Sequence, residues 1–294
     1  MREKWSNVMN GEVFKDKFIA FVDILGFKKI VEAAEDGTGM PLIDLIETLR
    51  ELGKPDDKKR IKEYGPMICP QSNFIQRDLN FQLTQISDCV VVSSEVSPAG
   101  VINLVNHCWG AVMRLLTKGI MCRGYITQGS VYHTDTQLIG TGYQKAYSKE
   151  GQVSAFKLAA DERGTPFVEV DQIVCDYVKN YGDKCVKEMF FRYVRKDGDV
   201  SALFPFQRLA HSFIIAGHGN TFDPKKEKRE NQKMRRMIEK VKERVIEFVD
   251  YSDSDAIRKA NHYITVLDAQ LEVCDRTDET IDILCSPFPP IGIK

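Results

Sequence analysis

The sequence predicts an α+β fold, with a mostly antiparallel sheet, flanking helices and a C-terminal helical region. Residues 18–170 alternate short apolar runs with stretches of helical periodicity, in the order strand, helix, helix, strand, strand, helix, strand, strand, helix, strand. Beyond residue 224 the patterns are charged, amphipathic and helical, with no strand pattern between them. We therefore expect one domain at 1–205 and a helical region at 206–294.

Composition and charge exclude several classes of protein. The chain has 294 residues, 43% of them hydrophobic and 28% charged, which is typical of a globular protein with a substantial core. A formal net charge of -1 argues against DNA as a partner, since nucleic-acid binders usually carry a basic surplus. No apolar run predicts a signal peptide or a membrane span, so we expect a cytoplasmic protein. Eight scattered cysteines without a C-x-x-C pair predict free thiols rather than a zinc site.

The first third of the chain predicts a buried strand followed by helices. FIAFVDILGF, at 18–27, is short, apolar and rich in aromatic and β-branched residues, and a helix is expected from Lys28. PLIDLIETLREL, at 41–52, has the apolar spacing of a helix with one buried face. Residues 53–73 are rich in charge, proline and glycine, and predict a long irregular excursion.

The later segments complete the predicted sheet and its helices. Asp88 falls at the junction of a strand pair, so the turn between those strands carries an acid. The expected elements are strands at 79–87 and 88–96, a helix at 100–119, strands at 120–127 and 130–133, a helix at 141–162 with a weak point at Gly151, a strand at 167–170, and helices at 225–250 and 255–273.

Two acids at strand ends suggest a metal site. Asp23 lies within an apolar run just before Gly26, where an ionised carboxylate is costly unless a cation pairs with it. Adjacent strands could bring Asp23 and Asp88 to one edge of the sheet. Mg²⁺ or Mn²⁺ is typically held by one or two carboxylates together with substrate phosphates. The turn after Asp23, which opens a helix, would offer backbone N–H groups to a triphosphate.

FVDILGF, QISDCVVVS and CRGYITQGSVYH, in this order, resemble the two metal-binding segments and the arginine-glycine strand pair of the class III nucleotidyl cyclases. The resemblance covers roughly residues 15–172. It implies two Mn²⁺ or Mg²⁺ ions, a nucleoside triphosphate substrate and a homodimer whose composite sites draw metal and base-reading groups from different subunits. Asp23, Ile24 and Asp88 would be the metal positions, and Gly26 and Phe27 would belong to the nucleotide cradle.

The chain departs from the family at several functional positions. Thr84 stands where purine cyclases carry a lysine or glutamate, and Gln137 stands where a second base-reading acid is expected. The ribose-orienting asparagine maps onto Gln144, and the arginine that supports the α-phosphate maps onto Ser148. That arginine's role would have to pass to a neighbour: Lys145, Lys149 or Arg123.

With both purine determinants missing, the combined motifs resemble the pyrimidine cyclases of the Pycsar antiphage system, which make cyclic UMP or cyclic CMP. Tyr64, Arg50 or Arg77 could then fill the space of the smaller base or bond to its O2. The implied reaction is attack of the ribose 3′-hydroxyl on the α-phosphorus with release of pyrophosphate. Two alternatives stay open: a purine cyclase with unusual base readers, and an inactive nucleotide-binding homologue, which Ser148 favours.

Overall fold

A computed structural model describes residues 13–68, 72, 76, 78–162, 164–206 and 222–286. The described residues form two compact units. The first reaches to Pro205, and the second begins at Phe206 and also takes in 117–119. No helix in the described ranges is both long and apolar enough to cross a membrane.

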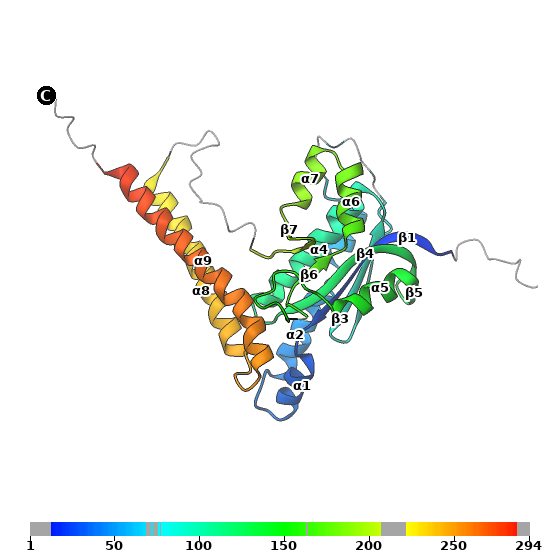
Figure 1. Ribbon diagram of the computed structural model, residues 1–294, viewed down its shortest axis with the longest axis horizontal. Coiled ribbons are helices and arrows are strands. Elements are labelled where there is room, and N and C mark those ends of the chain that lie inside the picture. Colours follow the sequence, from blue (N-terminus) through cyan, green and yellow to red (C-terminus); the bar gives the residue numbers. More distant parts are fainter. Residues whose placement is uncertain are drawn as a thin grey trace, which may run out of the picture. The chain divides into compact units, whose positions relative to one another are not determined.

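The first unit is built on a mixed, mostly antiparallel sheet of eight strands in its described part (Figure 1). The order is β2-β3-β1-β4-β6-β8-β7, and β5 pairs with β4 alone. Only the β4–β6 pair is parallel. This confirms the predicted fold class. The strands are β1 Lys15–Ile24, β2 Gln82–Ile86, β3 Cys89–Glu95, β4 Cys122–His133, β5 Leu138–Ile139, β6 Val168–Val170, β7 Val194–Asp197 and β8 Val200–Leu203.

The central strand β1 is buried on both faces, which explains its unbroken apolar run. Phe18 and the alternate residues up to Ile24 enter the main core with α4 (Pro98–Leu116). Ile19 and Phe21 point to the other face, where they pack with Ala146 of α5 (Thr141–Glu150). Asp23 shares this second face, which we call the α5 face.

The remaining helices of the first unit are shorter than α4. Asp171 and Asp183 accept hydrogen bonds at the N-termini of two of them, as N-cap residues commonly do. Their bounds are α1 Phe27–Glu35, α2 Leu42–Leu52, α3 Asp56–Tyr64, α6 Gln172–Tyr181 and α7 Lys184–Phe190.

The second unit is a pair of long helices, α8 (Pro224–Phe248) and α9 (Ser254–Cys285), which pack side by side (Figure 1). Asp223 and Asp253 cap their N-termini. Between the helices, the Asn231 side-chain amide donates to the Cys274 carbonyl at 2.8 Å. The helical character predicted for this region is therefore correct.

Several element predictions were wrong. Residues 53–73 contain the helix α3, because Ile61 supplies a buried anchor that the charged composition obscures. The two strands expected at 120–127 and 130–133 are one strand, β4, which stays paired with β1 through Gln128 and Gly129. At Gly129 a Cβ would lie 2.8 Å from the Cα of Gly142, so α5 can approach β4 closely only because both residues lack side chains.

The helix expected at 141–162 ends at Glu150. The chain then folds back, and the Val153 carbonyl accepts from Gly164 N at 2.9 Å and Thr165 N at 3.1 Å. Beyond the strand expected at 167–170, residues 172–203 form two helices and two strands that the sequence pattern did not predict. Among the described cysteines, Cys185 is disulfide-bonded, against the expectation of free thiols, and the other six are free.

Candidate metal and nucleotide site

The two candidate aspartates lie at the same edge of the sheet. Asp23 is paired in register with Cys89 of β3 on one side and with Arg123 of β4 on the other. Asp88 belongs to the tight turn between β2 and β3, and its carbonyl accepts a hydrogen bond from Ile24 N at 3.1 Å. The backbone next to one acid therefore touches the backbone of the other, which places both carboxylates at one strand end.

The charges around Asp23 are unbalanced. Burial, together with the nearby carboxylates of Asp88 and Glu150, raises the pKa of Asp23 to about 7. Arg123 lowers that pKa only in part, because its guanidinium is paired with Glu150 and also reaches the Gly164 carbonyl at 3.5 Å. Three carboxylates therefore share one cation, an excess of negative charge that a bound divalent cation would offset.

The available donor atoms fit a divalent ion whose remaining coordination positions are filled by the substrate. The described residues hold no cluster of three or more His, Cys, Asp or Glu side chains that could bind a metal. Two carboxylates with neighbouring backbone groups instead match the way in which Mg²⁺ binds, with substrate oxygens and water completing its shell. Ile24 can contribute only its backbone, since its side chain is 2% exposed in the main core.

Helix α1 begins four residues after Asp23. Gly26 precedes it with φ of 70°, a left-handed conformation that glycine adopts without strain. The Phe27 ring packs against the main core, so this residue anchors the helix start rather than facing a ligand with its side chain. The first N–H groups of α1 consequently lie beside the aspartate edge, where helix N-termini favour phosphate.

The two ends of α5 differ in their distance from the aspartates: Glu150 at its C-terminal end acts on Asp23, whereas Lys145 lies away from it. Gln144 is exposed, and the Lys145 ammonium is 2.5 Å from the Asp171 carboxylate. Thr127, which donates to Asp171 at 2.6 Å, pairs with Ile19, four residues along β1 from Asp23. Four residues of strand span about 13 Å. The structure therefore joins Arg123 to the aspartates but places Lys145 elsewhere on the sheet.

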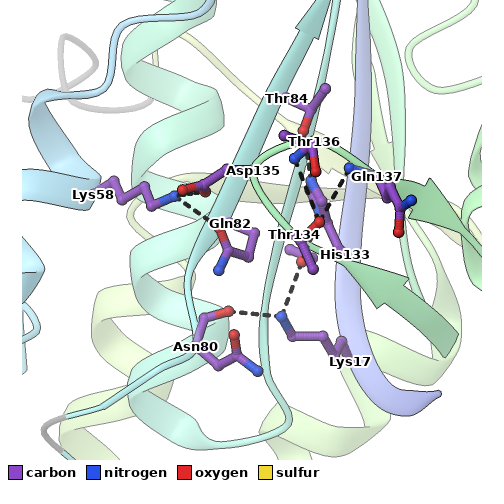
Figure 2. Close-up of polar contacts among 11 residues, drawn as sticks. Lys17, Lys58, Asn80, Gln82, Thr84, His133, Thr134, Asp135, Thr136 and Gln137 are labelled. Atoms are coloured by element: carbon purple, nitrogen blue, oxygen red, sulfur yellow. Dashed lines mark hydrogen bonds and ion pairs between the residues drawn. The ribbon is translucent and has the colours of Figure 1, made fainter. Parts of the chain in front are cut away.

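A second group of polar residues gathers around His133 at the end of β4 (Figure 2). The His133 ring nitrogen Nε2 is 2.9 Å from the Thr84 hydroxyl, and Nδ1 is 2.8 Å from the Ser93 hydroxyl. Gln137 closes the turn after His133, because its carbonyl accepts from Thr134 N at 2.9 Å. Purine cyclases would carry base-reading residues at the positions of Thr84 and Gln137. Here Thr84 contacts His133, and Gln137 lies in the turn that follows His133.

An open cavity of about 200 Å³ adjoins this group, and His133, Gln82 and Asn80 are among its lining residues. Lys58 of α3 donates to the Gln82 side chain at 2.8 Å and is ion-paired with Asp135. The charged segment at 53–73 therefore contributes to this region of the sheet through α3.

Tyr64 and Arg50, the other predicted nucleotide contacts, are peripheral. The Tyr64 side chain is 83% exposed at the end of α3, and Arg50 is exposed on α2. Within the described ranges, neither has a hydrogen bond or ion pair that connects it to the aspartates or to His133. Their predicted roles remain predictions, and Arg77 lies outside the described residues.

His133 should make folding stability depend on pH. Burial and the charges of Lys17 and Lys58 lower its pKa to about 4, and Asp135 opposes them. The unfolded chain, with the ordinary value of 6.5, then binds more protons between pH 4 and 6.5, so the free energy of unfolding rises with pH across that window. His133 should thereby lower the free energy of unfolding by about 2–3 kcal/mol from pH 7 to pH 4, a contribution that the raised pKa of Asp23 opposes.

His133→Gln should remove this contribution, so from pH 7 to pH 4 the free energy of unfolding of the variant should fall by about 2–3 kcal/mol less than that of wild type. Urea unfolding of both proteins at pH 7, 5.5 and 4 measures it, and equal slopes in the two proteins would contradict the assignment.

Three residues of these groups carry little functional signal in the sequence. Glu150, at the end of α5, is the third carboxylate near Asp23. Lys17 and Ser93 have no sequence pattern that indicates a functional role. A lysine at the start of a strand is usually exposed, whereas Lys17 is only 1% exposed. Their places in the two groups follow from the register between strands, which no local sequence pattern shows.

Comparisons with known proteins identify no close relative. No family model matches the chain, and no curated protein matches it. Among solved structures it is similar to the catalytic core of a rhodopsin-guanylyl cyclase with converted specificity in complex with ATPαS, at 14% identity and a TM-score of 0.36, over 57% of this chain and 82% of that one. It is also similar to a class III adenylyl cyclase-like ATP-binding protein from Pseudomonas aeruginosa, at 13% identity and a TM-score of 0.30. That match covers 58% of this chain and only 37% of the other.

Proposed function

We propose that this protein is a metal-dependent pyrimidine nucleotidyl cyclase, a lyase that converts UTP or CTP to the 3′,5′-cyclic monophosphate and pyrophosphate. The observation that carries the proposal is the meeting of Asp23 and Asp88 at one sheet edge with an excess of negative charge. Residues 1–205 would form the catalytic domain, active as a homodimer. The role in antiphage defence rests on the sequence resemblance alone.

In this proposal Asp23 and Asp88 hold Mn²⁺ or Mg²⁺, with backbone groups at Ile24. The ions would supply a lowered pKa for the ribose 3′-hydroxyl and charge neutralisation for the leaving pyrophosphate. Arg123 limits the repulsion among the carboxylates, and the first N–H groups of α1 would bind phosphate oxygens.

Gln144 and Lys145 would orient ribose and α-phosphate across a dimer interface, because Lys145 lies away from the aspartates of its own chain. Lys145 would have to exchange Asp171 for phosphate, because its ammonium is held there at 2.5 Å.

The test is to incubate the purified full chain with Mn²⁺ and, separately, UTP, CTP, ATP and GTP, and to identify products by mass spectrometry. We expect a cyclic pyrimidine monophosphate from wild type and none above background from Asp23→Ala. Asp44→Ala, which removes an exposed carboxylate of α2, is the matched control and should retain activity.

A cyclic purine product would replace the proposal with the purine-cyclase alternative. No cyclic product from folded, dimeric protein would contradict the proposed reaction and favour an inactive nucleotide-binding protein.

A further inference from the structure

The buried lysine of β1 has no carboxylate partner among the described residues. Lys17 lies on the α5 face and is only 1% exposed. Its ammonium donates to the Asn80 carbonyl at 2.6 Å and to the Ser93 hydroxyl at 3.1 Å, and both acceptors are neutral (Figure 2). Glu95 and Asp78 act on it only from beyond ion-pair distance. Since buried lysines are usually paired with an acid, the charge of Lys17 lacks its usual direct partner.

The hydrogen bonds around Lys17 leave one of its donors unused. A lysine ammonium has three donors and no acceptor, and two of the three are engaged within the described ranges. Ser93 is fully buried, and its hydroxyl hydrogen cannot go to Lys17, so Ser93 donates it to His133 Nδ1 at 2.8 Å. Burial and neighbouring lysines lower the pKa of His133 to about 4, which leaves this ring neutral near pH 7. The network therefore solvates the ammonium without supplying a negative charge.

Lys17 lines the open cavity of about 200 Å³, together with Lys15 and Gln82. None of the described lining residues is an aspartate or a glutamate. Lys58 donates to the Gln82 side chain at 2.8 Å, and since a lysine can only donate, the atom that it meets is the amide oxygen. The Gln82 amide nitrogen is then a donor with no acceptor among the described residues. The cavity thus combines positive charge with unused donors.

The cavity lies at the opposite edge of the sheet from the aspartates. Lys17 precedes Asp23 by six residues of β1, which corresponds to about 20 Å of strand. On β4, Arg123 pairs with Asp23 near the start of the strand, whereas His133, which lines the cavity, ends it. A ligand in the cavity is therefore remote from phosphates held at Asp23 of the same chain.

We propose that this cavity binds a small oxyanion, a phosphate or a carboxylate group, which pairs with the Lys17 ammonium. The third Lys17 hydrogen and the Gln82 amide nitrogen donate to its oxygens, and Lys15 adds positive charge at the cavity wall. Hydrogen bonds from a charged donor to an oxyanion are among the strongest in proteins. Water could solvate the ammonium but would leave its charge unpaired. The site is separate from the proposed catalytic centre and does not rest on the proposed function.

Calorimetric titration of the metal-free full chain with sulfate at pH 7, at an ionic strength held constant with sodium chloride, tests the site. We expect one saturable site per chain, with a Kd of roughly 1 mM or below. Lys17→Met, which removes the charge but keeps an unbranched side chain, should weaken binding at least about tenfold. Lys179→Met removes an exposed lysine charge from α6 and is the matched control, with wild-type affinity expected. Wild type without saturable binding, or Lys17→Met with wild-type affinity, would overturn the inference.

Gln82→Glu keeps the inference testable if Lys17→Met fails to fold, since Ser93 and Asn80 lose a donor in that variant. The change preserves the shape of the side chain, and Lys58 can still donate to it. It places a carboxylate in the cavity wall in place of the amide donor, so sulfate affinity should fall at least about tenfold. Gln232→Glu, the same change at an exposed site on α8, should have no effect. Unchanged affinity in folded Gln82→Glu would contradict the site.

Proton uptake identifies Lys17 as the group that meets the anion. Burial lowers the pKa of Lys17 to about 8, and Glu95 and Asp78 oppose this shift. Lys15 and Lys58 add to it. A bound anion favours the charged ammonium, so sulfate binding at pH 8 should take up as much as about half a proton per site. Titrations in buffers of different ionisation enthalpy measure the uptake. Equal uptake in Lys17→Met would assign it to another group and overturn the inference.

Two further titrations identify the ligand group and the place of binding. Phosphate and acetate, titrated in the same way, show which of the two groups the cavity accepts, and binding of either that Lys17→Met weakens supports the site. Asp23→Asn should bind sulfate as wild type does, because the cavity lies at the other edge of the sheet. Loss of sulfate binding in folded Asp23→Asn would place the anion beside the aspartates and contradict the assignment to Lys17.

Discussion

Replacing Asp23 with asparagine should lower the rate of cyclic-nucleotide formation roughly a thousandfold, an effect of the size that follows loss of a key electrostatic group. The substitution keeps the size of the side chain and removes the charge that would bind a divalent cation. Asp88→Asn should have a comparable effect, because both carboxylates meet at one edge of the sheet. Initial rates at saturating UTP and a series of Mn²⁺ concentrations measure the loss.

Stability measurements distinguish lost chemistry from lost folding in Asp23→Asn. The folded-state pKa of Asp23 is raised to about 7 from its ordinary 3.8, so the folded protein binds more protons than the unfolded chain between those values. Ionising Asp23 therefore lowers the stability of the metal-free wild type as pH rises through this window. Asp23→Asn lacks that penalty and should melt at an equal or higher temperature than wild type at pH 8. Near-wild-type activity, or a collapse of the fold, would contradict the assignment.

Replacing Arg123 with methionine should destabilise the metal-free protein by about 3 kcal/mol. Arg123 pairs with Glu150, and the two side chains are only 19% and 11% exposed. Without the guanidinium, Glu150, Asp23 and Asp88 would face one another with no neighbouring cation. Chemical denaturation at pH 8 measures the change, and added Mn²⁺ should restore part of the lost stability by supplying positive charge.

A double-mutant cycle isolates the Arg123–Glu150 interaction. Arg123→Met combined with Glu150→Gln should be more stable than the sum of the single changes predicts, since the second change removes the unpaired charge. Lys28→Met is the matched control, because its ion pair with Glu32 is exposed and should contribute less than about 0.5 kcal/mol. Strictly additive effects of Arg123→Met and Glu150→Gln would show that the pair does not couple.

The local sequence pattern was sufficient to predict an element where a single segment contains the whole pattern. The short apolar run at 18–27, rich in aromatic and β-branched residues, predicted a buried strand with Asp23 at its end, and β1 is that strand. The alternation and the turn residue at Asp88 likewise predicted the β2–β3 hairpin. Both results depend on side-chain periodicity within about ten residues.

Local pattern failed where long-range packing decides the structure. The charge of residues 53–73 concealed α3, which is held by one buried residue, Ile61. Gly129 looked like a strand break, yet β1 continues to pair across it and α5 needs the missing side chain. The short strands β7 and β8 have too few residues for a period of two to be recognised.

The sequence by itself determined the α+β class, the strand that ends in Asp23, the turn that carries Asp88 and the helical character of the C-terminal region. Only the tertiary structure decided which groups surround these acids, namely Arg123 and Glu150, and which side chains contact His133. The physical reason is that periodicity is encoded by neighbours along the chain, whereas the direction of a hydrogen bond and the pKa of a buried acid depend on groups that strand register brings together from distant segments.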